Sequence, residues 1–163
     1  AIFDTGWFAD EIFQNVEKER LEVKYLFITH MHGDHISAMG KLRKRWVGMQ
    51  VYSNSQGAPD KNRIQIGKSI NVGNLSVTAR LTPGHAEDGV TYVVNGWKDN
   101  APPVVVVGDA IFAGSMGKDF ITPKLAQRKV KEEILSLAGD ALICPGHGPM
   151  TTVAEELANN PFF

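Results

Sequence analysis

Apolar residues alternate between short continuous runs and stretches with helical spacing along the whole chain. The short runs predict strands at residues 1–3, 23–29, 50–53, 90–94, 104–107 and 141–144. Helical spacing predicts helices at residues 8–20, 36–46 and 123–138, and a last helix near Thr151, where Thr152 and Glu155 form a capping box. Residues 64–81 form short β segments with a hairpin turn at residues 71–74. This order predicts an α/β fold in one domain spanning residues 1–163.

Several side chains are assigned to packing or to solvent by the same pattern. The helix at 123–138 is expected to bury Leu125, Val130, Ile134 and Leu137. Phe8, Phe13 and Trp46 are assigned to the core, as is Cys144 at a strand end. The basic run of Lys41, Arg43, Lys44 and Arg45 is interpreted as a solvated helix face.

Composition limits the class of partner. The 163 residues carry a formal net charge of −1, so no overall field attracts nucleic acid. No apolar run approaches the roughly 20 residues of a membrane span, and no leader peptide is expected at the first residues. The chain enters partway along a strand, so we expect further sequence upstream. A single cysteine excludes an intramolecular disulfide and fits a reducing compartment, so we expect a cytoplasmic protein.

The five histidines all lie in two kinds of motif. His30, His32 and His35 share one run, HMHGDH, which also contains Asp34. His85 and His147 each follow a Pro-Gly pair. The alternative, five ordinary packed or exposed histidines, requires every one to fall in such a motif by coincidence, and we give that interpretation little weight.

The placement of these residues favours a metal site. His30, His85, His147 and Asp109 each follow a predicted strand, where side chains of an α/β sheet converge. His32 points the same way as His30 on extended backbone, and Gly33 allows a turn toward Asp34 and His35. Imidazole and carboxylate ligands suit zinc, iron, manganese or cobalt. Because five imidazoles and two carboxylates exceed the needs of one tetrahedral ion, we expect two metal ions, with Asp109 between them.

The motifs resemble those of the metallo-β-lactamase superfamily. The run THMHGDH at residues 29–35 resembles its H-x-H-x-D-H signature, and TPGH at 82–85, GD at 108–109 and PGHGP at 145–149 resemble its later motifs, in order. Asp4 resembles the acidic residue of the first motif, which is usually structural near the metals. The resemblance implies an αβ/βα sandwich of two mixed sheets with outer helices. The family also has strands before the first motif, and we expect them to be missing from this chain.

The resemblance also implies ligand roles. His30, His32 and His85 are expected to hold one ion, and Asp34, His35 and His147 the other, bridged by Asp109. The stretches GDAIFAGS at 108–115, PGHGPMTT at 145–152 and NNPFF at 159–163 are similar to the glyoxalase II-like branch. That branch implies thioester hydrolysis of an acyl-glutathione-type substrate by a metal-bound hydroxide, with Asp34 and Asp109 as catalytic residues and zinc as the expected metal.

Three alternatives stay open at this stage. A persulfide dioxygenase shares the motif set and uses one iron at the first site, and a lactonase or other esterase would use the same hydrolytic centre. A non-catalytic relative is disfavoured because buried unpaired histidines and aspartates are costly without metal.

Lys118 falls near a basic position that glyoxalase II-like enzymes use for the substrate carboxylate; a solvated surface lysine is the equally weighted alternative.

Overall fold

The computed structural model describes residues 1–118 and 122–163. They form two compact units, Ala1–Ile64 and Gln65–Phe163, each built around its own main sheet. The expectation of one domain over residues 1–163 stays a prediction. Across the described part of the chain, no helix has the length and apolar character needed to cross a membrane.

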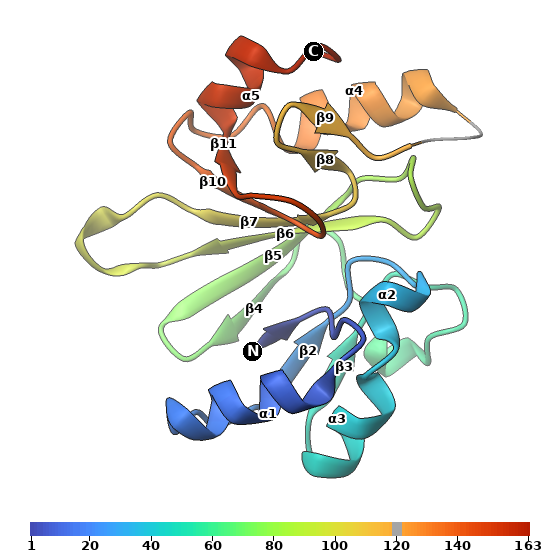
Figure 1. The fold of residues 1–163 in the computed structure, drawn as a ribbon, viewed down its shortest axis with the longest axis vertical. Helices are drawn as coiled ribbons and strands as arrows, with labels where there is room; N and C mark the ends of the chain where they lie inside the picture. Colours follow the sequence, from blue (N-terminus) through green and yellow to red (C-terminus); the bar gives the residue numbers. More distant parts are fainter. Residues whose placement is uncertain (119–121) are drawn as a thin grey trace. The chain divides into compact units, whose positions relative to one another are not determined.

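The first unit is a three-stranded parallel sheet in the order β1-β2-β3 with helices on one face (Figure 1). Its elements are β1 (Ile2–Phe3), α1 (Ala9–Lys18), β2 (Tyr25–Phe27), α2 (Gly33–Ile36), α3 (Met39–Arg45), β3 (Gln50–Tyr52) and the short 3₁₀ helix Asp60–Asn62. Side chains alternate along β2, so Leu26 and Ile28 enter the core with Leu42 of α3. Phe27 points to the other face, where it stacks on Phe3 of β1 at a ring-centroid distance of 5.2 Å.

Two predictions about this unit are wrong in detail. The expected helix at 36–46 is broken, since α2 ends at Ile36 and α3 begins at Met39. The backbone N–H of Ala38 is bonded to Gly6 O (3.1 Å) and Thr5 Oγ1 (3.2 Å), which interrupts the helical hydrogen-bond series. Phe8 is 72% exposed, because it lies before the first turn of α1. Phe13 and Trp46 do pack, with their rings edge-to-face at 5.3 Å.

The second unit contains a six-stranded mixed sheet in the order β11-β10-β7-β6-β5-β4 (Figure 1). Its elements are β4 (Ser69–Val72), β5 (Leu75–Leu81), β6 (Val90–Asn95), the 3₁₀ helix Lys98–Asn100, β7 (Val104–Gly108), β8 (Ile111–Phe112), β9 (Ser115–Met116), α4 (Pro123–Glu133), β10 (Leu142–Pro145), β11 (Thr151–Thr152) and α5 (Val153–Asn159). Among the strands described for this sheet, β10 and β7 pair in parallel and the other neighbours pair antiparallel. Gly73, with φ +61°, lies in the predicted hairpin turn between β4 and β5.

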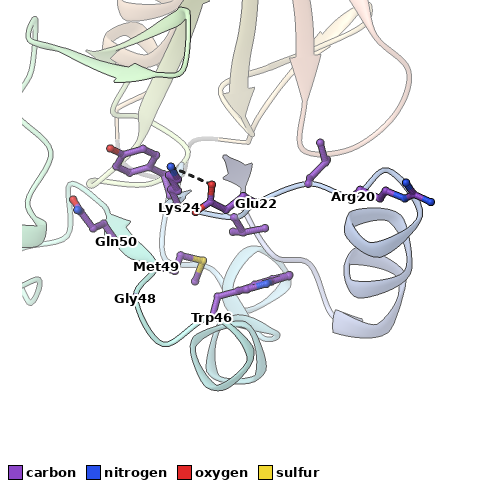
Figure 2. Close-up of a pocket in the computed structure, with 10 residues that line it drawn as sticks. Arg20, Glu22, Lys24, Trp46, Gly48, Met49 and Gln50 are labelled. Atoms are coloured by element: carbon purple, nitrogen blue, oxygen red, sulfur yellow. Dashed lines mark ion pairs between the residues drawn. The ribbon is translucent and has the colours of Figure 1, made fainter.

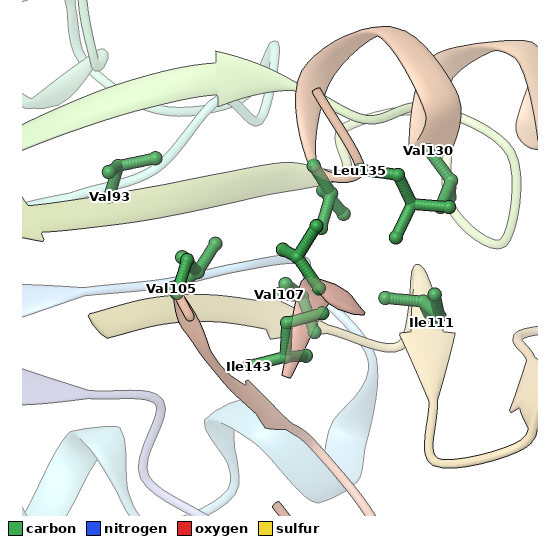
Figure 3. Close-up of a cluster of buried hydrophobic side chains, with 10 residues drawn as sticks. Val93, Val105, Val107, Ile111, Val130, Leu135 and Ile143 are labelled. Atoms are coloured by element: carbon green, nitrogen blue, oxygen red, sulfur yellow. The ribbon is translucent and has the colours of Figure 1, made fainter. Parts of the chain in front are cut away.

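The core of this unit lies between the sheet and α4 (Figure 3). Val105 and Ile143 of the parallel strand pair are fully buried, as is Ile134 at the end of α4. The predicted inward positions Val130 and Ile134 are confirmed, although α4 ends at Glu133 rather than near residue 138. The small hairpin β8–β9 was not predicted, and it follows directly after Asp109.

Candidate metal centre

The histidine run of the first unit begins where β2 ends. His30 and His35 are buried, whereas His32 is exposed and Asp34 is half-buried. The Nε2 atom of His30 lies 3.1 Å from Nδ1 of His32, and Oδ2 of Asp34 lies 3.8 Å from Nε2 of His35. Two ligand atoms of a tetrahedral ion with metal–nitrogen bonds of about 2.0–2.1 Å are about 3.3 Å apart. Both pairs therefore have a spacing that fits metal coordination.

Asp4 ties two of these histidines to the backbone behind them. Its Oδ1 accepts a hydrogen bond from the backbone N–H of Thr29 (2.7 Å). Its Oδ2 accepts from the Thr29 hydroxyl (2.7 Å) and contacts Nδ1 of His35 at 2.8 Å. The Thr29 hydroxyl also lies 3.0 Å from Nδ1 of His30. Asp4 adopts φ +53°, a left-handed conformation that aspartate tolerates better than most residues.

The protons of this network can be assigned by counting donors. A carboxylate only accepts, so the Thr29 hydroxyl and His35 Nδ1–H must both donate to Asp4. The single hydroxyl proton of Thr29 is then used, and His30 must donate through Nδ1–H. Neutral His30 and His35 are thereby held in the tautomer whose Nε2 carries a lone pair. Outer hydrogen bonds of this kind orient histidine ligands in metal sites, which is the structural role expected of Asp4.

A second set of bonds fixes the turn that carries Asp34 and His35. Thr5 donates to the backbone oxygen of His35 through both its N–H (2.7 Å) and its hydroxyl (3.1 Å). Gly33 was expected to supply a special turn, but it is the first residue of the helix α2 and has no positive φ. The one-turn helix α2 therefore presents Asp34 and His35, and Thr5 anchors its carboxyl end.

The second unit brings His85, Asp109 and His147 together. Oδ2 of Asp109 lies 3.5 Å from Nε2 of His85 and 3.5 Å from Nε2 of His147. The Asp109 side chain is 8% exposed and that of His147 is 55% exposed. These separations are longer than an ordinary N–H···O hydrogen bond and match the spacing of neighbouring metal ligands. The carboxylate thus lies between two imidazoles, as a bridging ligand requires.

The backbone around Asp109 accounts for this arrangement. Gly108 ends β7 with φ +53°, which turns the chain out of the sheet at the next residue. The chain returns through β8–β9 to Gly117, where an added Cβ would clash with the backbone oxygen of Asp109. Beyond it, the backbone oxygen of Lys118 lies 3.2 Å from Nδ1 of His85. A carbonyl only accepts, so His85 carries its proton on Nδ1 and leaves Nε2 to face Asp109.

The contact of Lys118 differs from the one that the sequence suggested. In the structure, Lys118 contacts His85 through its backbone oxygen. No sequence motif indicates a contact made by a backbone atom. Its side chain is exposed, and a contact with a substrate carboxylate stays a prediction. Two further residues of that motif, Asp119 and Phe120, lie outside the described residues.

The pocket in Figure 2 is a different place in the first unit. It has a volume of about 630 Å³, and its lining includes Trp46, Met49 and the ion pair of Lys24 and Glu22, whose charged atoms are 3.1 Å apart. The pocket lies where β2 and β3 begin, and the histidine run follows the other end of β2. It contains none of the candidate ligands.

Residues 1–147 match the family model described as the metallo-beta-lactamase superfamily. The chain belongs to this superfamily. The chain is 35% identical to the persulfide dioxygenase ETHE1 of Homo sapiens, over 91% of this chain and 59% of that protein. It is 24% identical to the hydroxyacylglutathione hydrolase GloC of Haemophilus influenzae, over 99% of this chain and 86% of that protein.

Solved structures are similar to this chain in fold. ETHE1 from Myxococcus xanthus is 30% identical with a TM-score of 0.83, covering 98% of this chain and 71% of that one. TTHA1623 in a di-iron-bound form is 23% identical with a TM-score of 0.79, covering 99% and 88%, and shows likeness of fold alone. The predicted fold class and the resemblance to the glyoxalase II-like branch are confirmed. The chain therefore spans 59% of the length of the human ETHE1 protein.

Proposed function

We propose that this chain is a binuclear metal-dependent hydrolase of thioesters, with an acyl-glutathione-type small molecule as substrate. The observation that carries the proposal is Asp109, whose Oδ2 is equally spaced at 3.5 Å from His85 and His147. In the proposed assignment these two histidines belong to different ions. A carboxylate shared between them supports a pair of ions rather than one.

The donor set of each unit supports the same assignment. In the assignment that the superfamily resemblance implies, one ion would be held by His30, His32 and His85 and the other by Asp34, His35 and His147, with Asp109 serving both. The mixture of imidazole and carboxylate suits zinc, with iron or manganese as the alternatives. Bound divalent ions supply Lewis acidity, which polarises a carbonyl and lowers the pKa of water. Asp34, whose side chain is 33% exposed, accepts a hydrogen bond from the attacking water and orients it toward the substrate carbonyl.

A second candidate is favoured by one specific observation. The identity of 35% to human persulfide dioxygenase exceeds the 24% identity to the hydroxyacylglutathione hydrolase. A persulfide dioxygenase needs one iron at the first site and consumes oxygen, so metal stoichiometry and oxygen uptake separate the two activities.

Elemental analysis of purified protein, combined with two activity assays, tests the proposal. We expect two metal ions per chain, hydrolysis of S-lactoylglutathione, and no oxygen uptake with glutathione persulfide. His32→Ala should abolish turnover and lower the metal content, whereas Lys44→Ala, an exposed change on α3, should leave both unchanged. One iron per chain with persulfide-dependent oxygen uptake would establish the second candidate instead. Wild-type turnover after complete metal removal would exclude both.

A further inference from the structure

We infer that Glu156 and Asn160 are positioning residues that hold Asp109 and His85 in place through the hairpin β8–β9. The inference rests on the proposed function, in which Asp109 and His85 are metal ligands. Neither residue belongs to the histidine motifs, and the resemblance of residues 159–163 to the glyoxalase II-like branch assigns Asn160 no role.

Glu156 is a carboxylate in an unusual environment. It lies on α5 and is only 2% exposed. Its Oε1 accepts a hydrogen bond from the Thr151 hydroxyl (2.6 Å), and its Oε2 accepts from the backbone N–H of Gly114 (3.0 Å) and from Nδ2 of Asn160 (2.7 Å). These three donors are uncharged. An apolar side chain would fill the same space without the desolvation cost of a carboxylate, so the hydrogen bonds are what this residue contributes.

Asn160 completes the attachment of the hairpin. Its Nδ2 donates one hydrogen to Glu156 and the other to the backbone oxygen of Ser115 (2.8 Å). Its Oδ1 accepts from the backbone N–H of Phe162 (3.1 Å), which fixes the amide orientation. Consecutive backbone groups of the hairpin turn, the N–H of Gly114 and the oxygen of Ser115, are therefore both bound to α5 and the residue that follows it.

The hairpin transmits this attachment to the ligands. β8 leaves Asp109 after one residue, and Ile111 pairs with Met116 of β9. The next residue, Gly117, is packed against the backbone oxygen of Asp109, and an added Cβ there would lie 3.1 Å from the Cβ of His85. Lys118 then offers the backbone oxygen that fixes the His85 proton on Nδ1. A displaced hairpin would move the Asp109 backbone and remove the acceptor that selects the His85 tautomer.

The test compares Glu156→Ala with Glu156→Gln. The glutamine keeps an oxygen for Gly114 and Asn160, and its Nε2 can donate to the Thr151 hydroxyl, so it should behave as the wild type. The alanine leaves Gly114 N–H and Asn160 without their acceptor. Glu155→Ala is the matched control, because it removes a charge from the neighbouring, exposed position of α5.

Three measurements are made on each full-length variant. In Glu156→Ala, the metal dissociation constant should rise about 10–100-fold, as for other residues that orient metal ligands. The absorption spectrum of the cobalt-loaded protein should change. The third measurement, nitrogen-15 NMR of the metal-free protein, should show both the loss of the single Nδ1–H tautomer of His85 and faster solvent exchange of the Gly114 amide. Glu156→Gln and Glu155→Ala should match the wild type in all three.

The outcomes separate this inference from the proposed function. Wild-type metal affinity, spectrum and His85 tautomer in folded Glu156→Ala would overturn the positioning role. Equal effects of Glu155→Ala and Glu156→Ala would also overturn it, since a general loss of α5 stability would then suffice. If the wild type took up no metal, the proposed function would fail, and the tautomer of His85 in the metal-free variants would still decide the positioning role.

Discussion

Replacing Asp4 by asparagine tests how the first unit orients its histidines. The substitution preserves shape and removes one charge and one acceptor. If the amide oxygen keeps the bond from Thr29 N–H, the amide nitrogen takes the position of Oδ2. There it faces Nδ1 of His35 at 2.8 Å and the Thr29 hydroxyl at 2.7 Å, both of which donate in the wild type.

The loss of metal affinity in Asp4→Asn follows from replacing an acceptor by a donor opposite His35. An amide nitrogen opposite Nδ1 favours the His35 tautomer with its proton on Nε2, which is the atom proposed to bind metal. Changes in such outer partners weaken metal binding about 10–100-fold, or about 1.4–2.7 kcal/mol. The opposite amide orientation is also unfavourable, because the buried N–H of Thr29 would lose its acceptor and the protein would be destabilised by about 1–3 kcal/mol.

Competition titration against a chelator of known affinity measures the effect. Asp4→Asn should weaken the binding of the ion held by His35 more than that of the other ion. Asp10→Asn, an exposed change in the first turn of α1, should bind both ions as the wild type does. Unchanged dissociation constants for both ions in Asp4→Asn would refute the tautomer argument.

Three further predictions concern the second unit. Ile134→Ala should lower the free energy of unfolding by about 2–5 kcal/mol in a denaturant titration, because the side chain is fully buried. Leu157→Ala, at a 56% exposed position, should change it by less than about 0.5 kcal/mol, and equal effects of the two substitutions would contradict the core assignment. Thr152→Ala should cost about 1 kcal/mol by removing the cap of α5, and Thr152→Ser should retain most of it, so equal losses in both would exclude the cap. Burial raises the pKa of the Cys144 thiol, so the folded protein should react more slowly with iodoacetamide than the unfolded chain does, and equal labelling rates would contradict this. For the same reason, the free energy of unfolding should fall as the pH rises past the ordinary pKa of a thiol.

The sequence was sufficient for elements whose pattern is local. Strong periodicity located α1 and strands of the second sheet. The predicted cap at Thr152 is confirmed by its bond from the Glu155 N–H, whereas the Glu155 carboxylate accepts a hydrogen bond from Nδ2 of Asn159. The placement of the five histidines after strands and Pro-Gly pairs indicated the candidate ligands. The family model supports the motif interpretation over residues 1–147.

Other features depend on contacts between distant residues and carry no local signal. The break between α2 and α3 results from bonds to Thr5 and Gly6, about thirty residues away in sequence. No sequence pattern singles out Glu156, because a glutamate on a helix is normally exposed. The hairpin β8–β9 has two-residue strands, which are too short for any periodicity to reveal.

The attachment of the β8–β9 hairpin has a consequence for synthesis on the ribosome. Gly114 is made 42 residues before Glu156, its acceptor. At about 5–20 residues per second, the interval is roughly 2–8 s, during which the nascent hairpin has no anchor. Loading of the Asp109 ligand set is therefore expected to be a late event in maturation, and a released chain truncated before Glu156 should bind metal poorly even though it contains every proposed ligand.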